Sequence, residues 1–115
     1  EFQNYIELYP NGKYAAKAER RIEQLKTKLA LKEYKSAELY YDIGKYKSAL
    51  VYYRHITEEY PDTKYADDAL YGVIKTQFVK KQYDQALESI KKFEDRYPTS
   101  PFLRNVLSIK SQIPY

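Results

Sequence analysis

Residues 46–61 read YKSALVYYRHITEEYP, and residues 83–98 read YDQALESIKKFEDRYP. Both stretches begin with tyrosine, carry Ala-Leu three residues later and end in Tyr-Pro. Pro61 and Pro98 stand 37 residues apart, and a third Tyr-Pro ends at Pro10, 51 residues before Pro61. A unit that recurs at this length indicates a repeat protein, in which each copy is one supersecondary element.

Apolar residues in both stretches recur at helical spacing, so each is predicted to be the second helix of a hairpin. Ala49 and Ala86 stand at equivalent positions and should let two helices cross closely. The predicted inward residues are Tyr46, Ala49, Leu50, Tyr53, Ile56 and Tyr60, then Tyr83, Ala86, Leu87, Ile90, Phe93 and Tyr97.

The first helices of the hairpins precede these stretches. Residues 13–43 contain no glycine or proline and are predicted to form one long helix ending at Gly44, which accepts a left-handed conformation. Asp62 or Thr63 is expected to cap the next helix, which ends near Lys80. The predicted stripes are Ala18, Ile22, Leu25 and Leu29, then Ala30, Tyr34, Ala37 and Tyr41, and in the next helix Ala66, Ala69, Leu70, Val73, Ile74 and Phe78.

The sequence therefore predicts an all-α protein, a single domain over residues 1–115 built as a stack of helical hairpins. Residues 1–9 are the end of a repeat, 13–60 an extended helix pair, 64–97 a second pair and 100–112 a capping helix. Ser100 is expected to cap that last helix, with Pro101 in its first turn. Its expected inward residues are Phe102, Leu103, Val106 and Leu107.

Composition excludes several classes of protein. The net charge is +4, from 20 basic and 16 acidic residues, and most basic residues are scattered among acids. A nucleic-acid footprint would need them on one face, so no nucleic acid is expected as a partner. The chain has no cysteine and no apolar run near the roughly 20 residues that cross a bilayer. The basic residues that do cluster are Lys26, Lys28, Lys32 and Lys35, with Lys80 and Lys81.

No motif indicates catalysis. His55 is the only histidine, and without a second histidine or a cysteine it has no partner for a typical metal site. Glu19 and Glu23 lie one turn apart but are expected to be solvated charges beside Arg20 and Arg21. Only three glycines are present, and no glycine-rich phosphate loop is seen. We therefore expect no enzyme, cofactor or metal.

The side chains that face away from the inward stripe of residues 46–60 suggest a docking surface instead. Tyrosine and arginine are the residue types that dominate interface energetics. A second interpretation stays open, in which Tyr52 packs on the preceding helix and His55 is an ordinary surface residue. The predicted protein-binding residues are Tyr52, Arg54, His55 and Glu59, together with the turn at Lys80 and Lys81.

Two motifs carry a resemblance to known families. Residues 44–50, GKYKSAL, and residues 81–87, KQYDQAL, resemble tetratricopeptide repeats, although the second copy lacks the glycine. A more specific set resembles the BamD/ComL outer-membrane assembly lipoproteins. That set comprises YPNGKY (9–14), RI (21–22), LA (29–30), EY (33–34), AELYY (37–41) and YPDT (60–63).

This resemblance implies a periplasmic scaffold at the bacterial outer membrane, in the machinery that assembles β-barrels. The expected partners are a BamA-like barrel-forming subunit, docked through a POTRA module, and other assembly lipoproteins. Members of the family attach to the membrane through an N-terminal lipidated cysteine, which this chain does not contain. The chain resembles the later repeats of the family and is expected to be a C-terminal fragment or a short member.

Three other functions remain as alternatives. A Tol-Pal-associated coordinator shares short Tyr-Pro-ended repeats, but the long first helix argues against it. A co-chaperone that clamps a peptide carboxylate would use asparagine on the inner stripe, whereas Asn4, Asn11 and Asn105 all lie outside the two complete pairs. A nucleic-acid binder using lysine and tyrosine is the third, and its binding would depend strongly on salt.

Overall fold

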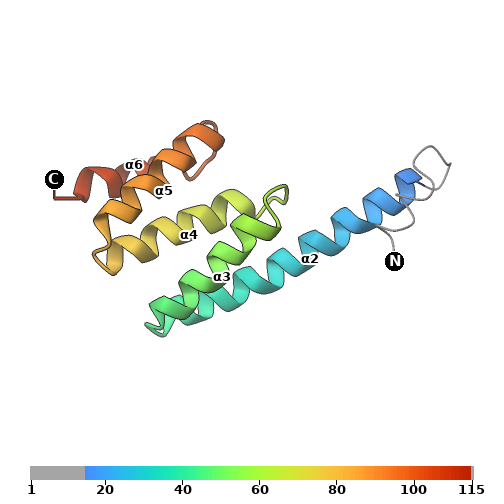
Figure 1. Cartoon of the computed structure of the whole chain (residues 1–115), viewed down its shortest axis with the longest axis horizontal. Helices are drawn as coiled ribbons and strands as arrows, with labels where there is room; N and C mark the ends of the chain where they lie inside the picture. The colour runs from blue at the N-terminus through green and yellow to red at the C-terminus, as the bar shows by residue number, and fades with distance from the viewer. Residues whose placement is uncertain (1–14, 115) are drawn as a thin grey trace.

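The computed structural model describes residues 15–114, and every regular element in that range is an α-helix (Figure 1). The predicted all-α class is therefore confirmed, whereas the helix end expected over residues 1–9 lies outside the described residues. The helices are α2 (Ala15–Asp42), α3 (Tyr46–Glu59), α4 (Ala66–Val79), α5 (Tyr83–Arg96) and α6 (Leu103–Gln112).

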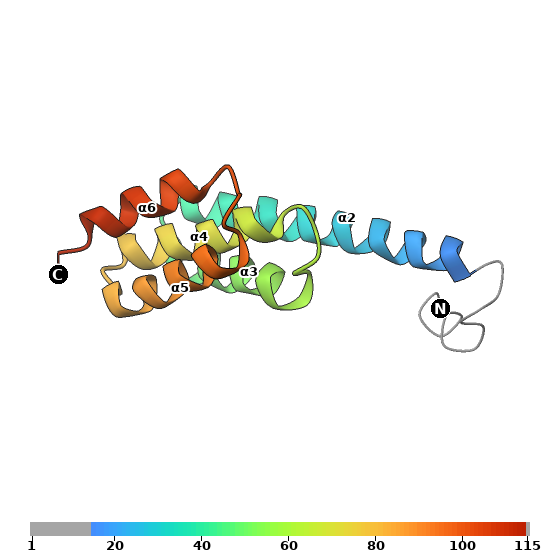
Figure 2. The ribbon, with the colours of Figure 1, turned by 90° about the horizontal axis from the view of Figure 1, so that it is seen from above.

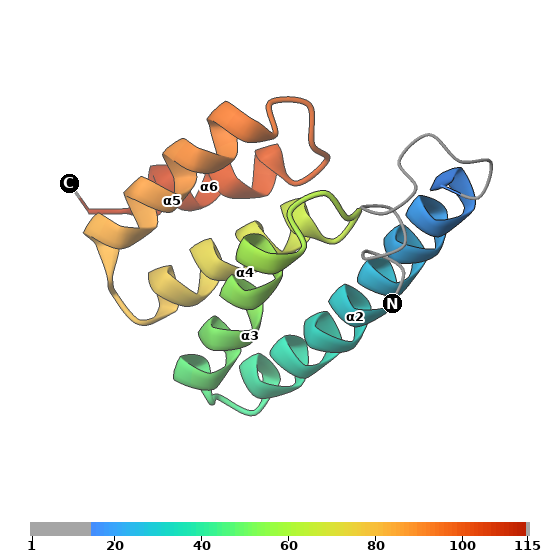
Figure 3. The same cartoon turned by 45° about the vertical axis from the view of Figure 1, so that its right-hand side comes forward.

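The helices form two layers, with α2, α4 and α6 in one and α3 and α5 in the other (Figure 2). Each helix contacts the next one along the chain, and α4 also contacts α2 and α6. The pairs α2–α3 and α4–α5 thus stack as successive hairpins, with α6 after the second (Figure 3). The result is an elongated body of 55 × 29 × 20 Å, as expected when each unit touches only its neighbours.

A Tyr-Pro pair ends the second helix of each hairpin and begins the connection to the next helix. Tyr60 and Tyr97 are the C-caps of α3 and α5, both with φ −128°. The aromatic residues four positions after the prolines, Tyr65 and Phe102, are the N-caps of α4 and α6. The expectation that Asp62 or Thr63 caps α4 is wrong, because the Thr63 hydroxyl instead donates to the Tyr60 carbonyl at 2.8 Å.

The last helix begins later than expected, at Leu103. The Ser100 hydroxyl accepts from the Phe102 amide at 3.1 Å and donates to Asp67 Oδ2 at 2.8 Å, which ties this turn to α4. Leu107, expected to face inward, is 42% exposed. Val106 is buried as expected, and Ile109 and Ile113 occupy the other inward positions, because the buried stripe follows the spacing 106, 109, 113.

The two hairpin turns share one backbone form. Gly44, after α2, has φ 80°, and Lys81, after α4, has φ 61°. In each turn the next residue's amide bonds back five residues, Lys45 to Tyr40 at 2.8 Å and Gln82 to Gln77 at 2.9 Å. This 6→1 bond is the mark of a Schellman motif. Lys81 therefore adopts a left-handed conformation that suits glycine better.

Helix α2 is uninterrupted, as predicted, and its 28 residues span about 42 Å. Its C-terminal half packs against α3, with Ala30 and Ala37 fully buried. Its N-terminal half extends beyond α3 (Figure 2). Leu25 and Leu29 were expected to face neighbouring helices but are 38% and 47% exposed, because no described helix covers this part of α2.

Small residues stand at the points where two helices cross closely. Ala49 and Ala86 are fully buried, in agreement with the predicted crossings. The sequence reading missed Gly72 in the middle of α4. A Cβ at this position would overlap the ring of Tyr53, so α3 and α4 approach more closely than an alanine would allow.

Candidate protein-docking site

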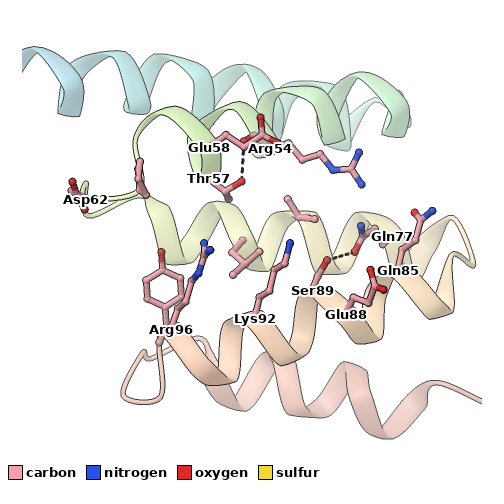
Figure 4. Close-up of a pocket in the computed structure, with 14 residues that line it drawn as sticks. Arg54, Thr57, Glu58, Asp62, Gln77, Gln85, Glu88, Ser89, Lys92 and Arg96 are labelled. Atoms are coloured by element: carbon pink, nitrogen blue, oxygen red, sulfur yellow. Dashed lines mark hydrogen bonds between the residues drawn. The ribbon is translucent and has the colours of Figure 1, made fainter.

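A polar groove of about 800 Å³ runs between α3 and α5, with α4 as its floor (Figure 4). Arg54 and Glu58 reach it from α3, and Glu88, Lys92 and Arg96 from α5. Acidic and basic side chains are mixed along it. Such a surface suits polar recognition of a protein rather than burial of an apolar ligand.

The floor of this groove holds a buried polar pair that positions Arg54. Gln77 and Ser89 are 2% and 9% exposed. In one orientation of the Gln77 amide, the Ser89 hydroxyl donates to its oxygen at 2.8 Å. In the reversed orientation the amide nitrogen donates to Ser89 Oγ at 2.8 Å and to the Gln85 carbonyl at 3.2 Å, while the amide oxygen accepts from Arg54 Nη2 at 3.3 Å. We adopt the reversed orientation, because it satisfies the whole buried amide.

On the other side of α3, a shallower hollow of about 500 Å³ brings together three of the predicted residues. Tyr52, Arg54 and His55 line it together with Glu33 and Val51. Val51 is 62% exposed, so the hollow offers apolar surface beside the charges. Arg54 and Glu58 line both the hollow and the groove, and they form the ridge between them.

Two residues of the hollow are held by neighbouring side chains. The ring of Tyr52 stacks on Tyr40 of α2, with centroids 5.4 Å apart and an interplanar angle of 11°. Tyr52 therefore packs on the preceding helix, as the second interpretation of the sequence expected. His55 Nδ1 lies 3.3 Å from Glu33 Oε2 without hydrogen-bond alignment, and its ring meets Tyr60 edge-on at 5.6 Å.

The other three predicted residues lie elsewhere. Glu59 is exposed at the end of α3, Lys80 is the C-cap of α4, and Lys81 is exposed in the α4–α5 turn. None of them lines the groove or the hollow. The sequence reading also missed Gln77 and Ser89, which could have been found as the positions 37 residues after Tyr40 and Tyr52.

A cluster of tyrosines fills the junction of α2, α3 and α4. Lys75 Nζ lies 4.5 Å from the ring centroid of Tyr41, 5.5 Å from that of Tyr71 and 6.0 Å from that of Tyr53. Burial raises the pKa values of Tyr34, Tyr41 and Tyr53 above the ordinary tyrosine range. Burial also raises the pKa of Asp68, and the neighbouring Tyr34 hydroxyl partly offsets the rise. The ring contacts of Lys75 and the tyrosines indicate a structural role for this cluster.

Within residues 15–114, no three histidine, cysteine or acidic side chains gather as a metal site would require. Over the same residues, none of the helices combines the length and apolar character needed to span a bilayer.

Comparisons with known proteins agree with the repeat pattern. A family model described as "Outer membrane lipoprotein" matches residues 1–78, and a tetratricopeptide-repeat model matches residues 68–100. The chain is 30% identical over 103 residues to the outer membrane protein assembly factor BamD of Neisseria gonorrhoeae and to that of Neisseria meningitidis serogroup A. The serogroup B protein is 29% identical over 104 residues. These matches cover 89–90% of this chain but only 38–39% of the relatives, so the chain spans about two fifths of their length.

Proposed function

Because the chain belongs to the outer membrane lipoprotein family matched over residues 1–78, we propose that it is a non-enzymatic scaffold in outer-membrane protein assembly. The family places it at the outer membrane, on the periplasmic side. Its relatives are assembly factors, and stacked helical repeats typically present surfaces for other proteins. On this proposal the chain acts by holding partners in place and transforms no substrate.

The partner we propose is the POTRA module of a BamA-like barrel-forming subunit, and the docking site is the solvent side of α3. The observation that carries this assignment is Arg54, which stands between the groove and the hollow with its guanidinium held against buried Gln77. A pre-positioned arginine loses less side-chain entropy when it pairs with a carboxylate of the partner. Tyr52, stacked on Tyr40, and His55, in edge-on contact with Tyr60, extend the same surface.

Titration of the chain with the periplasmic POTRA modules of the barrel-forming subunit tests this proposal. Arg54→Glu should weaken binding at least about tenfold, because a central interface arginine is replaced by the opposite charge. Arg104→Glu, at an exposed position of α6, is the matched control and should leave the affinity unchanged. Circular dichroism should show the same helix content in both variants.

Failure would take one of two forms. If the unaltered chain does not bind the modules, the proposed partner is wrong. If the chain binds but Arg54→Glu binds equally well, the partner stands and the docking site lies elsewhere, with Glu59 and the turn at Lys80 and Lys81 the next residues to vary.

A further inference from the structure

Five basic side chains line one side of α2, namely Lys17, Arg21, Lys28, Lys32 and Lys35. At about 100° per residue they fall within an arc of about 60°. All five are exposed, and none pairs with an acidic group in the part of the chain that the structure describes. The acids Glu19, Glu23 and Glu33 lie on the opposite half of the helix. Lys26 lies among these acids, and Asp42 lies at the C-terminal end of the basic row. Basic side chains nevertheless predominate on one side of α2, although they are scattered along the sequence.

Exposed apolar residues accompany this basic row. Leu25 and Leu29 adjoin it at 38% and 47% exposure, and Leu39 and Ile43 continue it toward the C-terminus at 59% and 58%. We call these four residues and the five basic ones the basic face of α2. A straight helix that carries parallel rows of lysine and leucine matches the pattern of helices that lie on a membrane surface.

The 37-residue shift argues against the C-terminal part of this face as a seat for another helix of the stack. Shifting Lys32, Lys35 and Leu39 by 37 residues gives Ala69, Gly72 and Thr76 of α4. Those three positions are buried, and Tyr53 of α3 lies directly against Gly72. A helix packed in the same way on α2 would have to bury two ammonium groups, which is costly without paired acids. At Lys32 and Lys35 we therefore expect an occupant that is anionic or aqueous.

We propose that the basic face of α2 rests on the anionic headgroups of a membrane. Protein interfaces are depleted in lysine, whereas anionic headgroups attract lysine and arginine alike, and four of the five cations are lysines. The exposed leucines would enter the boundary between headgroups and acyl chains. The outer membrane is within reach because the family is located there. This surface is separate from the docking site on α3, so its failure would leave the proposed scaffold function intact.

Binding of the purified chain to vesicles tests the proposal. Phosphatidylcholine vesicles with and without phosphatidylglycerol are mixed with the chain and floated through a density gradient. The chain should float with the anionic vesicles only, and raised salt should release it, since surface charges are screened. Lys32→Glu/Lys35→Glu should weaken this binding by about 30-fold or more.

The matched control is Lys91→Glu/Arg104→Glu, which makes the same change in net charge on exposed positions of α5 and α6. It should reduce binding much less than the α2 variant. Circular dichroism confirms that each variant is folded. The proposal is overturned if the unaltered chain does not bind anionic vesicles, or if both double variants lose binding equally, since net charge alone would then explain the attraction.

Discussion

The two hairpins α2–α3 and α4–α5 share a backbone plan but differ on the side that faces the start of the chain. Tyr40 and Tyr52 stack on that side of the first hairpin, and the positions 37 residues later hold the buried pair Gln77 and Ser89. Leu39 is 59% exposed, whereas its equivalent Thr76 is fully buried. The difference arises because α3 covers this side of α4, while no described helix covers it on α2.

The opposite side of the two hairpins is alike. Tyr34 stacks with Tyr65 at 6.0 Å in the first unit, and Tyr71 stacks with Phe102 at 5.6 Å in the second. These pairs are related by the same 37-residue shift. Position in the stack therefore decides which surfaces are buried, while the repeated sequence decides how each hairpin contacts the element that follows it.

The helix crossings should show the largest effect. Ala86→Leu is expected to lower the free energy of unfolding by about 1–3 kcal/mol, because Ala86 is fully buried and a larger side chain would overpack the crossing. Ala49→Leu should cost less, since the first hairpin can shift toward its uncovered side. Urea unfolding followed by circular dichroism measures both, with exposed Ala16→Leu as the control. An unchanged midpoint for Ala86→Leu would refute the equivalence of the two crossings.

Gly72 sharpens the comparison between covered and uncovered sides. Gly72→Ala should destabilise by about 1 kcal/mol, because displacing the Tyr53 ring costs more than the helix gains from alanine. Lys35→Ala, at the equivalent exposed position of α2, should be close to neutral. Thermal melts of the two variants give the contrast. A stabilised Gly72→Ala protein would mean that Tyr53 can move aside freely.

Tyr53 and its equivalent Ile90 offer a third test. The Tyr53 hydroxyl is buried without a hydrogen-bond partner, so Tyr53→Phe should stabilise the fold by about 1 kcal/mol at neutral pH. Burial raises the Tyr53 pKa in the folded state above its ordinary value of 10.0. The folded state therefore loses stability as pH rises above 10, so the advantage of phenylalanine should grow there.

Urea unfolding at neutral pH and above pH 10 measures the effect of Tyr53→Phe, with Tyr52→Phe as the control, which should change little. Tyr34 and Tyr41, whose pKa values are also raised, would still weaken the fold at high pH. A loss of stability on Tyr53→Phe at neutral pH would show that the hydroxyl has a partner.

The turns should give the smallest effect, with opposite signs. Lys81→Gly should stabilise by about 0.5 kcal/mol, because relief of the left-handed strain exceeds the added entropy of glycine in the unfolded chain. Gly44→Ala should destabilise by a similar amount. Thermal melts of both variants test this, and equal signs would show that the two turns are not equivalent.

Local signals predicted much of the fold. Helical spacing and the absence of glycine or proline predicted the length of α2, and Gly44 predicted its end, because these features act on the backbone itself. The cap of α4 and the inward face of α6 were predicted wrongly. Thr63 could have bonded either forward or backward, and Leu107 competed with Ile109 for the same buried side. Only packing against neighbouring helices decides between such alternatives.

The candidate site was predicted in part. Helical spacing alone placed Tyr52, Arg54 and His55 off the inward stripe, and the structure brings them to one hollow. The support for Arg54 was missed, because Gln77 and Ser89 interrupt otherwise apolar stripes on two different helices. The 37-residue shift leads to both positions but does not show that they contact Arg54. The roles of these residues in docking remain predictions.

The amino-acid order by itself determined the repeating hairpin, its family and the one long helix, because periodic side chains and turn residues act over short distances along the chain. Tertiary structure decided what each surface meets. Packing among α3, α4 and α5 buried a glutamine and a serine, and the side of α2 that no described helix covers left its lysines exposed. Burial depends on which helix arrives from elsewhere in the stack, and no local pattern encodes that.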